Sequence, residues 1–150
     1  MSGMTASHSS RVNAKMDDYY NHKALSGQQH IRVTDLLPAK NFEADLECNL
    51  LQINLAHPGL SGDKVRMYPR LAKLRFEAIS YCWGSRAVEK EHYSTCDGKR
   101  ISITGNTATI LRRLRLSTDT RRVWMDSVCI DQSSISERSQ QVTLMGHIFS

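Results

Sequence analysis

Long apolar runs are missing from this 150-residue sequence. A membrane-spanning helix needs about 20 continuous apolar residues, and a secretory signal needs a shorter apolar stretch at the N-terminus. Neither is present, so we expect a soluble cytoplasmic protein without a membrane partner. Up to Lys15 the chain has basic residues and serine but no acidic residue, which leaves mitochondrial targeting as an alternative. Asp17, Asp18 and the lack of an apolar face argue against that alternative.

Paired cysteine motifs are also missing. The four cysteines are Cys48, Cys82, Cys96 and Cys129. They lie far apart, form no C-x-x-C pair and have no histidine at zinc-ligand spacing, so the sequence encodes neither a disulfide framework nor a zinc site. We expect thiols in a reducing compartment, with no metal and no cofactor.

Aromatic residues are few, at 7% of the chain, and none lies between Arg112 and Arg122. The net charge of +5 is concentrated between Lys64 and Arg75 and between Arg112 and Arg122. Such clusters suit phosphates or an acidic partner. The second cluster, however, falls on the polar face of an expected helix and in the turn after it, and no aromatics are available for base stacking. These features favour a structural role for the cluster, with a nucleic-acid-binding module as an alternative hypothesis.

The sequence predicts one domain with an N-terminal arm. Residues 1–28 are polar, show no hydrophobic periodicity and cannot bury enough apolar area to offset the entropy of ordering, so we expect a disordered arm. Residues 29–150 have enough apolar side chains for one core.

Several strands are expected in the first half of this domain. One begins at His30 and stops at Pro38, and a second covers Leu46 to Leu55. Ser61 to Leu74 is polar and basic, which predicts a long surface loop. Phe76 to Trp83 has apolar or small side chains on both faces, so this strand is expected at the centre of its sheet.

The second half alternates strands with helices. Tyr93 to Ile103 should form a hairpin, because Asp97-Gly98 suits the positive φ angles of a tight turn. Asn106 is expected to cap a helix, Arg122 to Val128 to form a strand, and a last helix to run from Ile135 to the C-terminus. This pattern predicts an α/β fold with a mixed or parallel sheet, βα units in the second half and a β-rich N-terminal edge.

The last helix has an unusual distribution of polar residues. Ser134 and Glu137 fit a capping box at its start. At helical spacing one broad face is apolar, formed by Ile135, Val142, Leu144, Met145, Ile148 and Phe149, with Gln140, Thr143 and His147 opposite. Glu137, Arg138 and Gln141 fall on the apolar side, so we expect them to face the sheet rather than water.

A candidate site follows from this placement. Trp124 to Gln132 runs from a strand into a loop, and open α/β sheets bind ligands where strand ends meet helix N-termini. If the Phe76 to Trp83 strand is parallel to it, both reach the same edge. The pocket candidates are Tyr81, Trp83, Gly84, Trp124, Asp126, Gln132, Arg138 and Gln141. Asp126 and Glu137 are the candidates for a catalytic carboxylate.

Two interpretations of these residues remain open. In the structural one, Glu137 only completes the capping box, Arg138 pairs with Asp126, Gln141 holds a loop carbonyl and the tryptophans belong to the core. In the functional one, a carboxylate, Arg138 and an aromatic wall bind a nucleotide-like or peptide ligand. Spacing alone favours the structural interpretation, because one carboxylate without a positioned nucleophile is weak evidence for catalysis. Whether the protein is an enzyme is left open.

The same residues resemble a known family. Phe76 to Gly84 is similar to the Y-x-A-L-S-Y-x-W-G block of the fungal heterokaryon incompatibility (HET) domain. Val123 to Gln132, with the Glu137-Arg138 and Gln141-Val142 pairs that follow, is similar to its [LV]-W-[IM]-D-x-x-C-I-N-Q and E-R-x-x-Q-V block. The resemblance extends over most of residues 30–150. Three residues depart from the pattern, namely Thr107 for Leu, Asp131 for Asn and Ser85 for a frequent Asp.

The resemblance implies a role in nonself recognition after hyphal fusion, in which the domain signals growth arrest or programmed cell death through assembly or partner proteins. A suspected likeness of that family to TIR domains implies an alternative, cleavage of an NAD-like nucleotide, for which Glu137 is a candidate residue. The family pattern continues beyond Ser150, so we expect a domain truncated at its C-terminus, with lead-in strands over residues 29–75 and an incomplete family core over residues 76–150.

Overall fold

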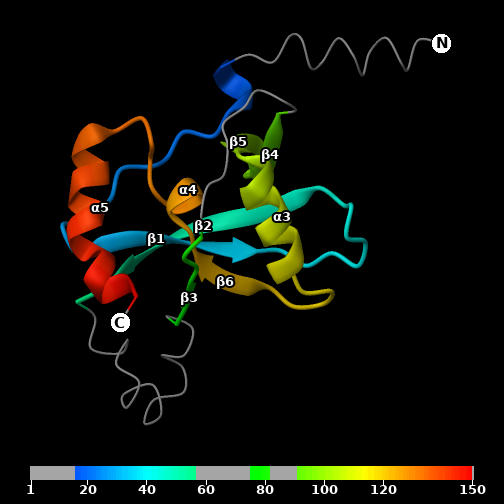
Figure 1. Ribbon diagram of the computed structural model, residues 1–150. Coiled ribbons are helices and arrows are strands. Elements are labelled where there is room, and N and C mark those ends of the chain that lie inside the picture. The colour runs from blue at the N-terminus through cyan, green and yellow to red at the C-terminus, as the bar shows by residue number, and fades with distance from the viewer. Residues whose placement is uncertain (1–15, 57–74, 82–90, 150) are drawn as a thin grey trace.

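The computed structural model describes residues 16–56, 75–81 and 91–149 (Figure 1). These residues contain a six-stranded sheet with the order β3-β6-β1-β2-β4-β5. The strands are β1 (His30–Leu36), β2 (Leu46–Asn54), β3 (Glu77–Ala78), β4 (His92–Cys96), β5 (Lys99–Ile103) and β6 (Arg121–Trp124). The helices are a 3₁₀ turn η1 (Met16–Asp18), α3 (Gly105–Leu114), α4 (Asp126–Cys129) and α5 (Ile135–Ile148).

The sheet is mixed, as the sequence predicts. β1 is antiparallel to both of its neighbours, β2 and β6, while β2 with β4 and β3 with β6 are parallel pairs. β4 and β5 form the predicted hairpin, in which Asp97 and Gly98 have φ angles of 52° and 74°. The expected β-rich N-terminal edge is not found: β1 and β2 are central strands, and β3 and β5 form the edges.

The predicted central strand from Phe76 to Trp83 is wrong in position and length. Among the described residues of this segment, 76–81, only Glu77 and Ala78 pair, and they lie at the sheet edge against β6. One further bond, from Ile79 N to Trp124 O at 2.9 Å, extends the contact. Apolar side chains on both faces suggested burial between two strands, but the chain leaves the sheet before Tyr81.

Two other element boundaries differ from the prediction. The strand expected over residues 122–128 ends at Trp124, and α4 begins directly afterwards with a bond from Cys129 N to Met125 O of 2.8 Å. The N-cap of α3 is Thr104 rather than Asn106, because Thr104 Oγ1 accepts from Thr107 N at 3.1 Å. The first correction replaces the end of a predicted strand by a short helix, and the second moves a helix start by two residues towards the N-terminus.

α5 has the predicted N-cap but not the predicted apolar face. Ser134 Oγ accepts from Glu137 N at 3.2 Å. The buried residues of the helix are Gln141, Leu144 and Ile148, with Met145 and Glu137 partly buried. Ile135 and Val142, which we expected inside, are exposed, because the helix is rotated so that Glu137 and Gln141 reach the sheet.

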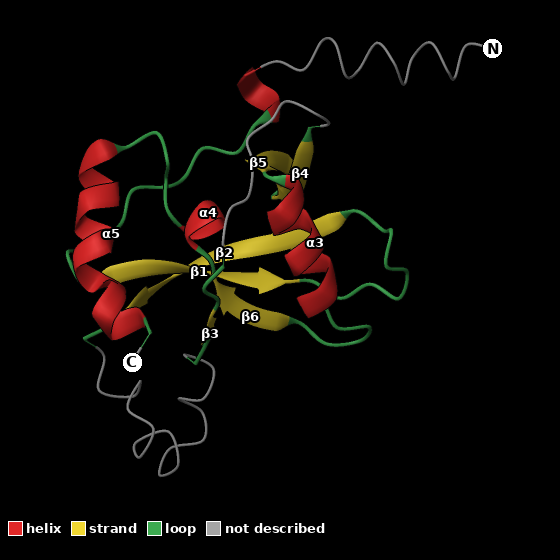
Figure 2. Cartoon of the chain, viewed as in Figure 1, coloured by secondary structure: helices red, strands yellow, loops and turns green. Residues whose placement is uncertain are grey.

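Two clusters of buried side chains form the core, and the helices that cover them lie against the sheet in Figure 2. One lies beneath α3 and α4 and includes Leu36, Leu46, Cys48, Ile101, Leu111 and Val128. The other lies beneath α5 and includes Ile31, Val33, Ile53, Trp124, Leu144 and Ile148. None of the helices in the described part of the chain is long and apolar enough to cross a membrane.

The segment between η1 and β1 crosses the domain as an ordered strap, which we define as residues 19–28. Tyr20 N donates to Arg100 O at 2.8 Å, and Ser26 N donates to Gln52 Oε1 at 2.9 Å. Gln140 Nε2 donates to Gln28 O at 2.8 Å. The expectation of a disordered arm therefore does not describe these residues, because polar side chains of the domain satisfy their backbone groups; residues 1–15 lie outside the described part.

Candidate functional site

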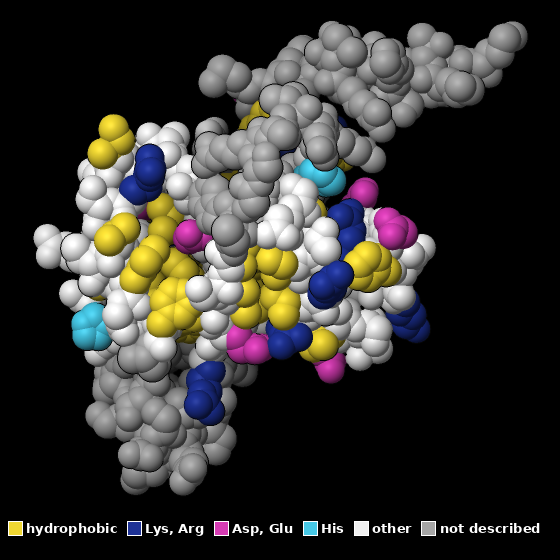
Figure 3. All heavy atoms as spheres, viewed as in Figure 1, with side chains coloured by type: hydrophobic (Ala, Val, Ile, Leu, Met, Phe, Trp, Pro, Cys, Tyr) yellow, Lys and Arg dark blue, Asp and Glu magenta, His cyan; other side chains and the backbone are white. Residues whose placement is uncertain are grey.

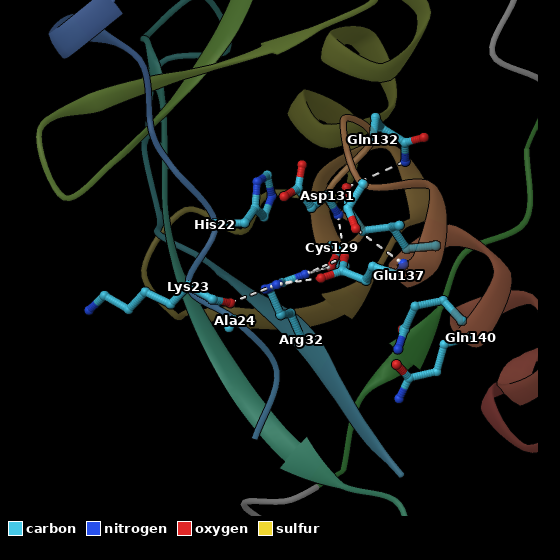
Figure 4. A network of polar contacts seen from close by, with 12 residues as sticks. His22, Lys23, Ala24, Arg32, Cys129, Asp131, Gln132, Glu137 and Gln140 are labelled. Atoms are coloured by element: carbon cyan, nitrogen blue, oxygen red, sulfur yellow. Dashed lines mark hydrogen bonds and ion pairs between the residues drawn. The ribbon is translucent and has the colours of Figure 1, made fainter. Parts of the chain in front are cut away.

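The centre of the site is a buried ion pair between β1 and α5. Arg32 Nη1 and Nη2 donate to the two carboxylate oxygens of Glu137, both at 2.7 Å (Figure 4). The side chains are only 3% and 11% exposed. Nη1 also donates to Cys129 O at 3.0 Å and Nη2 to Lys23 O at 2.7 Å, whereas the buried Nε has no hydrogen-bond partner among the described residues. The pair therefore joins the strap, β1, the end of α4 and the start of α5.

Glu137 has a different role from the predicted one. Its Oε2 also accepts from the backbone N–H of Asp131, whereas Ser134 N donates to Asp131 O at 3.1 Å. The capping box is therefore only half formed. Ser134 Oγ accepts from Glu137 N, but Ser134 N donates to Asp131 O instead of the Glu137 carboxylate. The carboxylate is held by three donors and organises the loop before α5.

A pocket of about 310 Å³ lies beside this ion pair. It is lined by His22, Ala24, Leu25, Arg32, Asp131, Ser134, Ser136, Glu137 and Gln140. Figure 4 shows His22 and Asp131 on one side of the pair and Gln140 on the other. The strap forms one wall and the first turn of α5 forms the opposite one, so the pocket lies between two segments far apart in sequence.

The charges in the pocket are compensated locally. Burial acts to raise the pKa of Asp131, but the Ser133 hydroxyl and amide, with His22 and Arg32, lower it below its ordinary value. Ser133 Oγ donates to Asp131 Oδ1 at 2.6 Å. His22 Nε2 lies 2.9 Å from Val128 O, which makes that nitrogen the donor. Asp131 is therefore ionised, and His22 is oriented by the backbone.

Tyr81 belongs to a second group, a chain of hydroxyls where β6 ends and α3 begins. Tyr81 OH donates to Ser127 Oγ and accepts from Thr107 Oγ1 at 3.1 Å. Thr107 in turn lies 2.9 Å from Thr104 Oγ1. Burial raises the pKa of Tyr81, while its hydrogen bonds with Ser127 and Thr107 act to lower it. The charge of Asp126 acts to raise the pKa of Tyr81. This carboxylate, which was predicted for the site, therefore lies near the group of hydroxyls.

The other predicted pocket residues have separate places. Gln132 Nε2 donates to Asp126 O at 2.8 Å, which closes the α4 turn. Gln141 is fully buried and donates to His30 O at 3.0 Å, so it holds a strand carbonyl rather than a loop carbonyl. Trp124 is core, with its ring edge-on to Phe149.

Arg138 does not join the site. It is exposed on α5, so the predicted inward position of this residue is wrong. The helix turns Glu137 inward by pairing it with Arg32, which leaves Arg138 beyond the edge of the buried face. Trp83 and Gly84 lie outside the described residues.

The structure thus divides the predicted site into two groups and adds residues that the sequence did not indicate. Arg32 and His22 were missed. Arg32 carried one signal, a charged residue within the alternating Ile31 to Leu36 strand pattern. His22 carried none, because the strap was expected to be disordered.

Most of the second basic cluster serves the fold. Arg115 donates four bonds of 2.9 to 3.1 Å to the carbonyls of Asn41, Phe42, Ala44 and Asp45. Arg121 pairs with Glu77 and Arg122 pairs with Asp35. These arginines are already bonded within the domain. Of the first cluster, only Arg75 lies in the described part of the chain, and it is exposed.

The cysteines in the described part of the chain are buried free thiols. Cys48 and Cys96 are register partners on the parallel strands β2 and β4. The hydrogen bond with Cys96 and burial raise the pKa of Cys48. Burial raises the pKa of Cys129 to about 11, while a hydrogen bond with Thr34 acts to lower it. The hydrogen bond with Cys48 lowers the pKa of Cys96, but all three thiols are buried and so lack the exposure of a reactive thiol.

Comparison with known proteins identifies the family. The model of the family described as heterokaryon incompatibility protein (HET) matches residues 76–150, half of the chain. The Neurospora crassa protein described as heterokaryon incompatibility protein 6, OR allele, is 30% identical over 143 residues, which cover 87% of this chain. The chain spans 19% of the length of that relative. No solved structure matches the chain significantly. On this evidence, the chain belongs to the heterokaryon incompatibility (HET) family.

Proposed function

We propose that the domain acts in the fungal cytoplasm as a binding module of heterokaryon incompatibility. It takes part in nonself recognition and signals growth arrest or programmed cell death by assembly or by binding partner proteins. The family match and the description of the Neurospora relative support the incompatibility role. The signalling step, its location and its partners are our proposal.

One observation favours binding over catalysis. Glu137, the candidate catalytic carboxylate, accepts from Arg32 at both oxygens and from the Asp131 amide. Both carboxylate oxygens are therefore already bonded within the domain and hold its segments together. The other residues of the family block follow the same pattern, since Gln132 and Gln141 hold backbone carbonyls. The side chains of the family block thus hold the backbone of the domain in place and support the surface above it.

Growth of a fungal host that expresses the full-length parent protein tests this proposal. We expect the unmutated protein to arrest growth and Trp124→Ala or Glu137→Ala to relieve the arrest, because both changes remove buried contacts beneath the site. Asn49→Ala, at an exposed position of β2, is the control and should arrest growth like the parent. Normal growth with the unmutated protein, at an expression level confirmed by immunoblot, contradicts the proposal.

The pocket supports a second candidate, hydrolysis of an NAD-like nucleotide in a TIR-like manner. Its volume of about 310 Å³ lies at the lower end of the range for small-molecule sites, and Asp131 and Glu137 both line it. Incubation of the full-length domain with NAD, followed by measurement of nicotinamide, decides between the candidates. Turnover that is lost in Glu137→Gln supports hydrolysis, provided that circular dichroism shows the variant to be folded. Absent turnover, or turnover unchanged by this substitution, excludes it.

A further inference from the structure

The pocket between the strap and α5 has one charge that the domain does not neutralise. Arg32 and Glu137 neutralise each other, because the guanidinium donates to both carboxylate oxygens at 2.7 Å. Asp131 also lines the pocket and has no ion pair among the described residues. Apart from His22, the other side chains that line the pocket are uncharged. The pocket therefore has an excess of negative charge.

The free hydrogen-bonding groups beside this charge are acceptors. Ser133 N and Oγ both donate to Asp131 Oδ1, at 3.1 and 2.6 Å, so Oδ2 has no partner among the described residues. His22 Nε2 donates to Val128 O at 2.9 Å, and Nδ1 is then an acceptor in the neutral ring. Figure 4 shows the His22 ring beside Asp131, and His22 is among the groups that lower the pKa of Asp131. Two acceptors, one of them ionised, thus lie on the same side of the pocket.

Apolar side chains of the strap form the neighbouring wall. Ala24 and Leu25 line the pocket, and Leu25 is half-buried. Their side chains suit the methylene groups of a long amphipathic ligand, whose charged end would lie at Asp131. At about 30 Å³ per water-sized group, a volume of about 310 Å³ holds roughly ten such groups, which is more than the five heavy atoms of a lysine side chain.

The first turn of α5 has the opposite preference. A helix N-terminus favours an anion, and Ser136 of this turn lines the pocket. Glu137, however, already places a carboxylate in the first turn. Asp131 lies next to it, since its backbone N–H donates to Glu137 Oε2. A phosphate or a nucleotide would therefore meet two carboxylates, so we expect the pocket to favour a cation.

The net charge of +5 does not reverse this preference. In Figure 3 the Lys and Arg side chains on the visible face gather mainly on the side where Figure 1 places α3, rather than over α5. Figure 4 shows the Lys23 side chain pointing away from Arg32 and Glu137. Exposed charges more than about 10 Å away are largely screened at moderate salt. The Asp131 carboxylate, which lines the pocket, therefore has the larger effect.

Asp131 is also a position at which this chain departs from the family block, which has Asn there. An Asn side chain has the same shape and can accept from Ser133 through its own oxygen, but it has no charge. The excess negative charge of the pocket therefore depends on this one residue of the chain.

We propose that the pocket binds a primary ammonium group on an aliphatic chain. The nitrogen donates to Asp131 Oδ2 and His22 Nδ1, and the methylene groups lie along Ala24 and Leu25. Asp131 is the residue that determines this specificity. The source that fits is a lysine side chain of a partner protein, and this part of the inference rests on the proposed function. A free aliphatic amine has the same chemistry and is distinguished by the experiment.

Titration of the isotope-labelled 150-residue chain, followed by two-dimensional NMR at constant ionic strength, measures binding. The probe is Nα-acetyl-lysine methylamide, and we expect a dissociation constant on the order of 1 mM, with shifts at the amides of residues 22–25 and 131–137. The same compound acetylated at Nε has no charge and should bind about tenfold more weakly. Inorganic phosphate should cause no shifts at these amides. Pentylamine, which lacks the peptide groups, shows whether a free amine is an equal source.

Three variants test the assigned contacts. Asp131→Asn keeps an acceptor for Ser133 and should weaken binding of the lysine probe about tenfold, because the charge is lost. Ser136→Lys adds a positive charge at an exposed position that lines the pocket, so it should weaken binding with Asp131 intact. Asp119→Asn removes the same charge at an exposed position that does not line the pocket, and should leave the dissociation constant within about twofold.

The possible results separate this inference from the proposed function. No shifts at about 20 mM probe, equal binding of the Nε-acetylated compound, or unchanged affinity in a folded Asp131→Asn chain overturns the ammonium site. Pentylamine binding as tight as that of the lysine probe supports the site but overturns the lysine source. If the parent protein arrests growth while the chain does not bind the probe, only this inference fails. If the chain binds the probe while the parent does not arrest growth, only the proposed function fails.

Discussion

Arg32 and Glu137 lie 105 residues apart in sequence and share two hydrogen bonds of 2.7 Å. Both side chains are largely buried, so removal of one partner leaves the other charge without compensation. We expect Glu137→Ala to lower the free energy of unfolding by about 3 to 5 kcal/mol, as measured by urea denaturation followed by circular dichroism.

Two comparisons show whether burial causes this loss. Glu77→Ala breaks the ion pair with Arg121, whose side chains are 28% and 55% exposed, and should cost less than about 1 kcal/mol. The double variant Arg32→Met with Glu137→Leu removes both charges and should lose less than the sum of the two single variants. Equal losses in the free energy of unfolding for Glu137→Ala and Glu77→Ala would show that the buried pair does not hold the loop before α5.

Local signals were sufficient to predict several elements. The N-cap Ser134, the Asp97-Gly98 turn and the β1 and β2 boundaries all depend on residues within a few positions. Backbone propensities and capping act over that range. These predictions therefore needed no knowledge of tertiary contacts.

The wrong predictions concern features that depend on contacts between residues far apart in sequence. The rotation of α5 follows from the bond between Glu137 and a strand residue 105 positions earlier, which no helical pattern contains. This rotation exposes Val142 and Arg138, which we expected to face inward, whereas Gln141 is buried as expected. Likewise, the edge position of β3 depends on which strand pairs with β6. The candidate site was placed near the correct elements, but the residues that form its pocket could not be assigned without the strap.

Arg115 supports the loop of residues 41–45 through four backbone carbonyls. A lysine ammonium is a compact charge without the planar fork of a guanidinium and cannot reach all four acceptors. We expect Arg115→Lys to lower the free energy of unfolding by about 2 kcal/mol and to speed hydrogen exchange of the loop amides. Arg113→Lys, at an exposed neighbouring position, is the control. Unchanged exchange in Arg115→Lys would contradict the supporting role.

Cys129 should make stability depend on alkaline pH. Burial raises the pKa of its thiol from an ordinary value of 9.0 to about 11 in the folded chain. Between these values the unfolded chain loses the proton while the folded chain keeps it, so the free energy of unfolding falls as pH rises through this range. The contribution is fully present below the lower value and amounts to about 3 kcal/mol at most.

Urea denaturation at a series of pH values, compared between the parent chain and Cys129→Ala, measures this contribution. The variant is expected to be less stable at neutral pH, because it leaves a small cavity. Its loss of stability with rising pH should be shallower than in the parent, since other alkaline groups titrate in both proteins. Parallel pH curves for the two proteins would exclude the buried thiol as the cause.

The strap depends on Gln52, an exposed residue of β2 whose side chain accepts from Ser26 N and donates to Ala24 O, both at 2.9 Å. Gln52→Ala removes two bonds that hold the strap, so local opening becomes more frequent while most of the core is untouched. Cleavage by trypsin after Lys23 requires such opening, because Lys23 O is bonded to Arg32. We expect this cleavage to become several-fold faster in Gln52→Ala, with global unfolding changed by less than about 1 kcal/mol. Asn49→Ala on the same strand should be cleaved at the parent rate. If Gln52→Ala is cleaved no faster than the Asn49 variant, the remaining contacts of the strap, including His22 and Gln140, are sufficient to keep the pocket wall in place.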